Sequence, residues 1–205
     1  MDLLETQIFE DEASVTQRLR QMQVEKAPLL NARNVAYGAS GDATPLHAAN
    51  APGTFAYHHG LYALRDGLVG EIWKPDRTDG IETVKNEELR IRIGFSNVDI
   101  ACHLEPKPKP RSSKGVGAER ACTGNLFGYL PEYVPRHRGG WFTYYLMVDE
   151  DGRAELSLPI VKANTFHDWV ERIFLSDGSD LHEPMNTTED SDEDTFEPAV
   201  TRKTK

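Results

Sequence analysis

The stretch WFTYYLMVDEDGRAELSLPIV, residues 141–161, decides the fold class predicted for this chain. Apolar residues occupy every second position in 142–148 and again in 154–160, which is the period of a half-buried strand. The Glu-Asp-Gly between the two runs is a common hairpin turn with its glycine in the left-handed position. The two runs therefore predict a β-hairpin in which Val148 faces Ala154, with the other apolar pairs on the same face.

The segment 88–104 shows the same alternation, broken once at 96–97. With 96–97 as a two-residue turn, Phe95 faces Val98 and the remaining apolar residues of the segment pair on one face. The sequence therefore predicts a second hairpin and, together with the first, an antiparallel sheet of at least four strands.

Three further segments show the helical period of apolar residues. They are predicted to form helices at 10–26, ended by Pro28, from Thr54 to about Gly70, and at 165–174. The last of them carries a broad apolar stripe that needs a large surface to pack on, and the sheet offers one. The predicted fold class is therefore α+β, with helices packed on one face of an antiparallel sheet.

The chain of 205 residues is expected to form a single α+β domain at 10–176. A flexible N-terminus at 1–9 precedes this domain, and the stretch 38–53 within it is expected to be a loop. Residues 177–205 are mostly acidic, Ser, Thr and Pro residues. Such a segment has too little apolar surface to offset the entropy cost of ordering, so the tail is predicted to be disordered.

The cellular location is inferred from features that the sequence lacks. It contains no run of about 18 apolar residues that could span a membrane. Its acidic first residues lack the basic-then-apolar pattern of a signal peptide. Cys102 and Cys122 are therefore expected to be reduced thiols. These observations predict a soluble cytoplasmic protein with no membrane partner.

Charge is distributed unevenly along the chain, whose net charge is −10. Residues 101–140 reverse this sign, with seven Lys and Arg residues against three acidic ones. Prolines that alternate with cations at 106–111 favour a stiff extended backbone. Small residues at 112–118 let backbone N–H groups approach an anion closely. Cations interleaved with aromatic residues further along are typical of proteins that bind single-stranded nucleic acid.

An anion or nucleic-acid site is therefore predicted in the basic segment 105–140. Its candidate residues supply positive charge, close backbone approach or a stacking ring: Lys107, Lys109, Arg111, Lys114, Gly115, Gly117, Arg120, Tyr129, Arg136 and Arg138. The leading hypothesis is a non-enzymatic binding or accessory protein that contacts a polyanion, foremost nucleic acid, through this segment. The competing interpretation is a basic surface loop whose aromatic side chains turn inward to cover the sheet.

Two alternative functions remain open. In the first, the protein is a small enzyme that acts on a phosphorylated or nucleotide-like substrate. Lys114 and Arg120 would then clamp the phosphate. The acid–base group would be Glu119 or His103. In the second, the protein is an adaptor or inhibitor that binds another protein through its first helix and its acidic tail.

No cofactor and no metal are predicted. The GxxxxGK[ST] loop and the Rossmann fingerprint are both absent from the sequence. The residues that could be combined into a zinc site lack the paired spacing of zinc ligands: Cys102, His103, Cys122 and His137. We therefore expect a binding protein and not a metalloenzyme.

Overall fold

The computed structural model describes residues 6–122 and 140–181, which form one mixed seven-stranded sheet covered by helices. The strands follow the spatial order β1-β7-β6-β5-β4-β3-β2. Their bounds are β1 Gln7–Phe9, β2 Trp73–Asp76, β3 Thr83–Asn86, β4 Ile91–Asn97, β5 Phe142–Val148, β6 Ala154–Lys162 and β7 Thr165–Ser176. β1 is parallel to β7 and β4 to β5, whereas the other neighbours are antiparallel. The predicted α+β class is confirmed.

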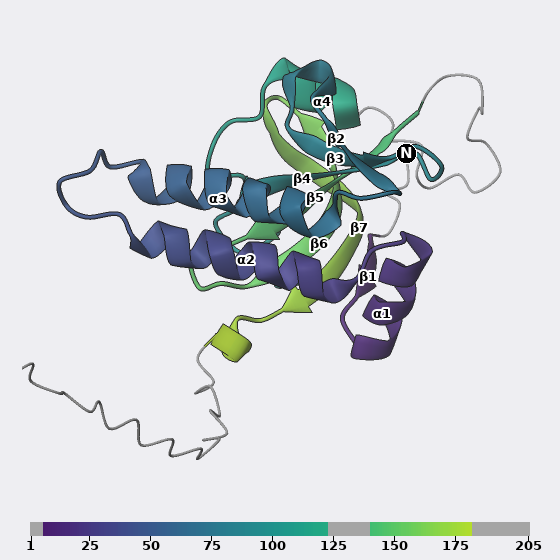
Figure 1. Ribbon diagram of the computed structural model, residues 1–205, viewed down its shortest axis with the longest axis horizontal. Helices are drawn as coiled ribbons and strands as arrows, with labels where there is room; N and C mark the ends of the chain where they lie inside the picture. Colours follow the sequence, from purple (N-terminus) through teal and green to yellow (C-terminus); the bar gives the residue numbers. More distant parts are fainter. Residues whose placement is uncertain (1–5, 123–139, 182–205) are drawn as a thin grey trace, which may run out of the picture.

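The described residues include four α-helices: α1 Glu12–Gln21, α2 Lys26–Gly41, α3 Ala51–Leu68 and α4 Val116–Cys122. Two short 3-10 turns are η1 Thr78–Gly80 and η3 Ser179–Leu181. Figure 1 shows α2 and α3 side by side against the sheet. α4 packs against β5 and β6 on the opposite face, the second face. None of these four helices combines the length and apolar character needed to cross a membrane.

The first predicted helix is divided in two, and the expected stop at Pro28 is wrong. α1 ends at Gln21, and Gln23 then adopts a positive φ of 55°, which a helix does not contain. α2 follows, and Pro28 lies in its first turn, where a missing N–H costs nothing. The loop expected at 38–53 therefore shrinks to 42–50.

The second predicted helix is confirmed as α3, which packs closely on α2 and β4. At Gly60 of α3, a Cβ atom would lie 2.6 Å from the Phe95 ring of β4 and 2.9 Å from the Cβ of Ala36 in α2. Glycine at this position therefore lets the two helices and the sheet meet. The larger apolar core lies here, between the helix pair and the sheet.

The first predicted hairpin is confirmed in its register as β5–β6, with Val148 facing Ala154. The apolar side chains that the prediction pairs, such as Leu146 and Leu156, are buried beneath α2 and α3. Across the turn, Arg153 lies 3.3 Å from the buried carboxylate of Asp149. The same carboxylate accepts two amide hydrogens of the turn, so the turn is closed by its own side chain.

The second predicted hairpin, at 88–104, is wrong. β4 lies inside the sheet, antiparallel to β3 and parallel to β5, so both of its edges are occupied. Val98 forms a bridge with Pro110 instead. Cys102 adopts a positive φ of 56° as the chain departs from the sheet. Residues 98–104 therefore form a crossing segment over the second face and not a strand.

The helix predicted at 165–174 is also wrong, because this stretch belongs to strand β7. Register shifts between β6 and β7 change the face to which the side chains of β7 point. Phe166 and Trp169 pack on the second face. Val170 and Ile173 pack beneath α2 and α3. Because of these shifts, apolar residues that point to two different faces follow one another at spacings of three and four residues. The same spacings mark one side of a helix.

A buried ion pair on the second face holds the crossing segment 98–104. Glu155 of β6 and Arg172 of β7 have side chains that are 0% and 1% exposed, and they meet at 2.6 Å. Glu155 also accepts the amide hydrogen of Cys102, at 2.7 Å. Arg172 donates to the carbonyl of His103, also at 2.7 Å. The pair therefore ties the crossing segment to two neighbouring strands.

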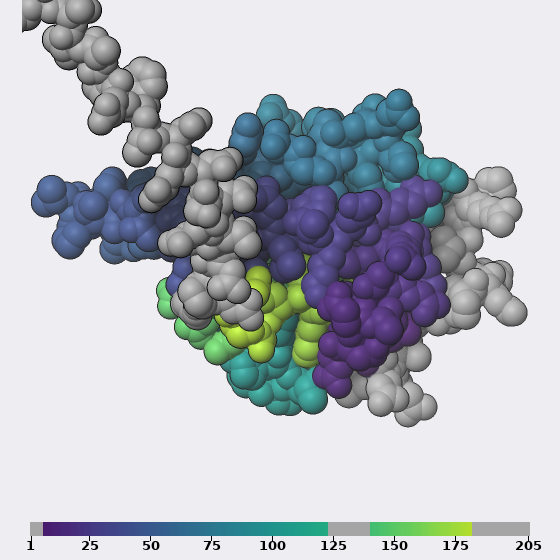
Figure 2. All heavy atoms as spheres, turned by 60° about the horizontal axis from the view of Figure 1, so that its bottom comes forward, coloured from purple at the N-terminus to yellow at the C-terminus, as the bar shows by residue number. Residues whose placement is uncertain are grey.

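The C-terminal end of the described chain is held by a buried arginine of α2. Arg33 donates to the carbonyl of Gly152 at 2.8 Å and forms an ion pair with Asp180. In Figure 2, the yellow residues of β7 and η3 lie between the purple N-terminal helices and the teal residues that follow β4. A buried arginine therefore anchors this end of the chain to α2, although the residues of η3 are not buried.

The predicted termini fall mainly on residues that the structure does not describe, 1–5 and 182–205. Two short parts of them are described. Gln7–Phe9, within the N-terminus expected to be flexible, form β1. Residues 177–181, at the start of the tail expected to be disordered, include η3.

Replacing Arg172 by methionine is expected to lower the free energy of unfolding by about 3–5 kcal/mol, because Glu155 would become an unpaired buried carboxylate. Urea denaturation measures this loss. Lys26→Met is the matched control, because Lys26 pairs with the exposed carboxylate of Glu12. Its expected effect is below about 1 kcal/mol. A loss at Arg172 no larger than that at Lys26 contradicts the importance of the buried pair.

Candidate functional site

The basic segment folds back along the chain that follows β4. The amide of Asp99 donates to the carbonyl of Lys109 at 3.0 Å, and the amide of Arg111 donates to the carbonyl of Asn97 at 3.1 Å. Residues 107–111 therefore form a strap that runs antiparallel to the end of β4 and to the start of the crossing segment.

The cations of this strap point to separate carboxylates. Lys107 Nζ lies 3.5 Å from Asp168 of β7. Arg111 pairs with Glu150 in the β5–β6 turn. Lys109, between them, is exposed to solvent. The described cations of the strap are thus distributed along it and do not gather in one cleft.

Lys114 is directed into the protein. Its Nζ donates to Ser96 Oγ at 2.7 Å. The same atom lies 5.0 Å from the centroid of the Tyr145 ring and 5.1 Å from that of Phe166. Burial lowers the pKa of Lys114 from its usual 10.5 to about 8. Lys114 is therefore not placed as an exposed lysine that contacts a phosphate at the surface.

The remaining predicted site residues lie in or near α4 or beyond it. Gly115 is exposed just before α4, and Arg120 is exposed within it. Gly117 allows α4 to approach η1, because a Cβ atom there would lie 1.9 Å from the carbonyl oxygen of Asp79. Three predicted residues fall outside the described part of the chain: Tyr129, Arg136 and Arg138. The predicted nucleic-acid surface therefore stays a prediction.

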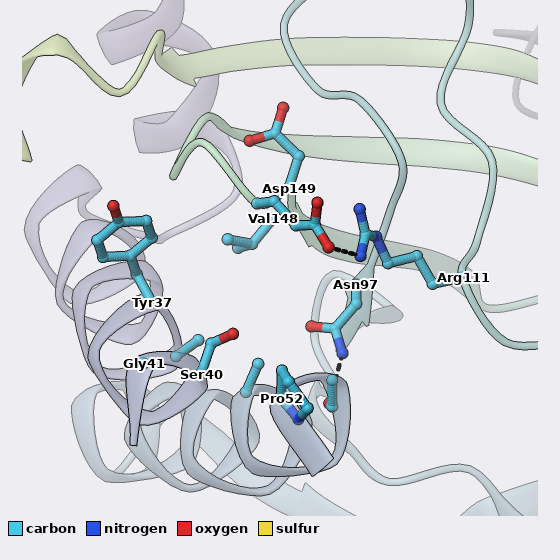
Figure 3. A pocket seen from close by; sticks show the side chains of 12 residues that line it. Tyr37, Ser40, Gly41, Pro52, Asn97, Arg111, Val148 and Asp149 are labelled. Atoms are coloured by element: carbon cyan, nitrogen blue, oxygen red, sulfur yellow. Dashed lines mark hydrogen bonds and ion pairs between the residues drawn. The ribbon is translucent and has the colours of Figure 1, made fainter. Parts of the chain in front are cut away.

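A pocket of about 350 Å³ opens where the parallel strands β4 and β5 end (Figure 3). The C-terminal turns of α2 and the first turns of α3 form its walls. Open α/β sheets bind ligands at the carboxyl ends of their parallel strands, where the following chain leaves the sheet. The position of this pocket makes it the leading candidate site among the described residues.

Small residues of the two helices and a strand build the floor of the pocket: Ala36, Gly41, Gly53 and Ala56, with Val148 of β5. Asn97, at the end of β4, donates to the carbonyl of Gly53 at 2.7 Å and joins α3 to the strand. Figure 3 shows Tyr37 and Ser40 of α2 across the pocket from Asn97 and Arg111. Small side chains leave room for a flat apolar group against the floor.

The rim of the pocket carries a guanidinium that already binds a carboxylate. Arg111 Nε donates to the carbonyl of Val98 at 3.0 Å, which fixes the direction of the guanidinium. Arg111 Nη1 pairs with Glu150, whose side chain is 70% exposed. A hydrogen bond from Arg111 lowers the pKa of Glu150 below its usual value. Asp149 points away from the pocket in Figure 3 and accepts the amide hydrogen of Ala101.

Arg111 belongs to the predicted site residues, whereas the other lining residues were not predicted. Ser40 fell in a stretch that was expected to be a loop, and Asn97 was assigned to a hairpin turn. The informative signal is the parallel pairing of β4 with β5, which sets Asn97 beside Val148. The alternation of apolar residues within each strand does not show which strand is its parallel neighbour.

The described residues contain no group of three His, Cys, Asp or Glu side chains that could hold a metal ion. Cys102 and Cys122 are free thiols, and burial raises the pKa of each to about 12. Neither is therefore an activated nucleophile. The two acid–base candidates lie on different elements, with His103 in the crossing segment and Glu119 in α4.

Comparisons of the chain with known protein families, with curated proteins and with solved structures found no match. No relative therefore assigns a role to the pocket or to the basic segment. The function is inferred from the geometry and the charges of the described residues.

Replacing Lys114 by methionine is expected to stabilise the protein by about 1–3 kcal/mol at pH 7. The pKa of Lys114 is about 8 in the folded chain and returns to about 10.5 on unfolding, so folding disfavours the charged amine below pH 8. The gain in stability of the variant over the wild type is expected to decrease as the pH rises from about 8 to about 10.5. Urea denaturation of both proteins at pH 7 and pH 10 measures it. If the difference in unfolding free energy between the two proteins is the same at pH 7 and pH 10, the burial of a charged amine at Lys114 is contradicted.

Proposed function

We propose that the protein is a non-enzymatic binding protein that recognises a small anion with an apolar body in the pocket at the ends of β4 and β5. Arg111 is the recognition residue. The observation that carries this proposal is the ion pair between Arg111 and Glu150 at the rim. The sequence predicts a polyanion contact through the whole segment 105–140. Here a single cation of that segment, Arg111, binds a small anion.

The rim ion pair marks a position where a carboxylate already binds. The Arg111 guanidinium is anchored to the carbonyl of Val98, whereas Glu150 extends into solvent from a turn. An exposed ion pair contributes at most about 1 kcal/mol, so a ligand anion can replace Glu150 at low cost. The guanidinium fork matches carboxylate and phosphate alike, and the ligand anion is therefore one of these two groups.

The interior of the pocket supports the apolar part of such a ligand. Small residues line its interior, and Tyr37 offers a ring at its side. The volume of about 350 Å³ lies in the range of small-molecule sites, about 300–1,000 Å³. Pro52 and Gly53, in the first turn of α3, bring the positive end of that helix dipole to the pocket.

The charged groups that line the pocket favour binding over catalysis. Asp149 already accepts the amide hydrogens of Ala101 and Asp151. Glu150 is paired with Arg111. Within the described lining, each carboxylate therefore already has a partner in the chain, and an acid–base pair that faces a substrate is not formed.

The exposure of Lys109 and Arg120 supports a second candidate function, contact with single-stranded nucleic acid through the whole basic segment 105–140. Arg111 belongs to both candidates. The adaptor hypothesis also stays a prediction, because most of the acidic tail lies outside the described residues.

Titration with phenyl phosphate and with benzoate, two probes that join an anion to a ring, tests the pocket. Arg111→Gln is expected to weaken binding about tenfold or more, because it removes a charged hydrogen bond worth about 1.5–3 kcal/mol. Glu150→Gln is expected to strengthen binding up to about fivefold, because it removes the internal competitor. Calorimetry measures both changes. Lys107→Gln, which removes the other ion pair of the strap, is the matched control and is expected to change nothing.

Binding that is equal in the wild type and in Arg111→Gln, or that is weaker in Glu150→Gln, rules out the pocket as an anion site. A single-stranded oligothymidylate supplies the other arm of the experiment. If the two probes fail to bind and the oligonucleotide binds with a steep salt dependence, the anion contact belongs to the wider basic segment.

A further inference from the structure

Lys114 occupies a second site, on the other side of β4 from the pocket. Ser96 and Asn97 are adjacent in β4, so their side chains point to opposite faces of the sheet. Asn97 lines the anion pocket. Ser96 Oγ instead accepts the hydrogen bond from Lys114 Nζ, on the second face. Lys114 is thus separate from the proposed anion site and independent of it.

Within the described ranges, the neighbours of the Lys114 amine are aromatic rings and a hydroxyl, not carboxylates. Tyr145 and Phe166 lie close enough for both rings to interact with a cation at Nζ. Lys114 forms no ion pair with any residue in the described ranges. Loss of hydration without a carboxylate partner disfavours the ammonium form. The site therefore admits both the neutral amine and the cation.

A buried hydroxyl lies in the same cluster. Tyr145 is 4% exposed, and its hydroxyl has no hydrogen-bond partner among the described oxygen and nitrogen atoms. It interacts with the thiol of Cys122 in α4, which is a weak sulfur partner. Buried hydroxyls nearly always have a strong hydrogen-bond partner, and a thiol is a weak one. A bound oxygen atom near Lys114 would supply a stronger partner.

We propose that Lys114 is a nucleophilic amine that forms an imine with a small aldehyde. The cluster on the second face provides a desolvated amine, the Ser96 hydroxyl that holds it, and the Tyr145 hydroxyl as a hydrogen-bond donor. Proteins use desolvated lysines for this chemistry, because the neutral amine is the nucleophile.

The reaction balances without an oxidant or a reductant. The neutral Nζ attacks the carbonyl carbon, and one proton moves from the nitrogen to the carbonyl oxygen to give a neutral carbinolamine. The hydroxyl of the carbinolamine then leaves as water with one proton taken from solvent, while the Tyr145 hydroxyl donates a hydrogen bond to the departing oxygen. Overall, amine, aldehyde and one proton give an iminium ion and water. The iminium charge stays beside the rings of Tyr145 and Phe166, which stabilise a cation.

The lowered pKa of Lys114, about 8, makes the amine available at neutral pH. At pH 7.5 roughly a quarter of such amines are neutral, against roughly one in a thousand for an ordinary lysine. Among the described residues, the titratable groups that face it are Tyr145 on β5 and Cys122 on α4. Burial raises the pKa of both, so both are neutral at this pH and neither restores the charge of the amine.

Reductive trapping on the full chain tests the proposal. Treatment with propanal and cyanoborohydride at pH 7.5, followed by peptide mass mapping, is expected to label Lys114 at least about tenfold faster than Lys109. Lys109 is the internal control, because it is an exposed lysine of the same basic segment. The rate at Lys114 is expected to level off above about pH 8, whereas the rate at Lys109 continues to rise toward about pH 10.

Variants separate the chemistry from a structural role. Tyr145→Phe and Ser96→Ala are expected to slow labelling of Lys114 by roughly threefold to tenfold, with the rate at Lys109 unchanged. Lys114→Arg is expected to remove labelling at this position while circular dichroism shows an intact fold. Equal rates at Lys114 and Lys109, or an unlabelled Lys114 in folded wild-type protein, overturn the proposal.

Discussion

The positions of both candidate sites depend on one buried ion pair, Glu155 with Arg172. Each of these charges would be costly to bury alone, so the fold must keep them together and satisfy their remaining hydrogen bonds. Two of the partners come from the crossing segment, as the amide of Cys102 and the carbonyl of His103. The chain that follows β4 is therefore drawn across the second face and does not return as a neighbouring strand.

The course of the chain after β4 determines the positions of Arg111 and Lys114. The strap returns along the end of β4 and brings Arg111 to the rim of the pocket, on the side of α2 and α3. Three residues later, Lys114 enters the second face beside Ser96. One short basic segment thus serves both faces of the sheet. Its charges differ in role because Arg111 remains at the surface, whereas Lys114 loses most of its contact with water.

Much of the fold could be predicted where a strand pairs with its immediate successor, as Val148 does with Ala154 across a turn. Prediction failed at 88–104, because an apolar match between two halves of a segment does not exclude other partners for each half. β7 was mistaken for a helix, because bulges move Phe166 and Val170 to opposite faces. Within the site, the charge of Arg111 was visible in the sequence, whereas the rest of the pocket arises from parallel pairing between distant strands.

Native-state hydrogen exchange in the wild type and in Glu155→Gln tests most directly whether the buried pair positions the strap and both sites. In the wild type, the amide of Cys102 is expected to be protected, because it donates to Glu155. Glu155→Gln is expected to speed exchange at Cys102 and throughout 98–111, while the β5–β6 hairpin keeps its protection. Exchange in 98–111 that stays at the wild-type rate would contradict the central role of the pair.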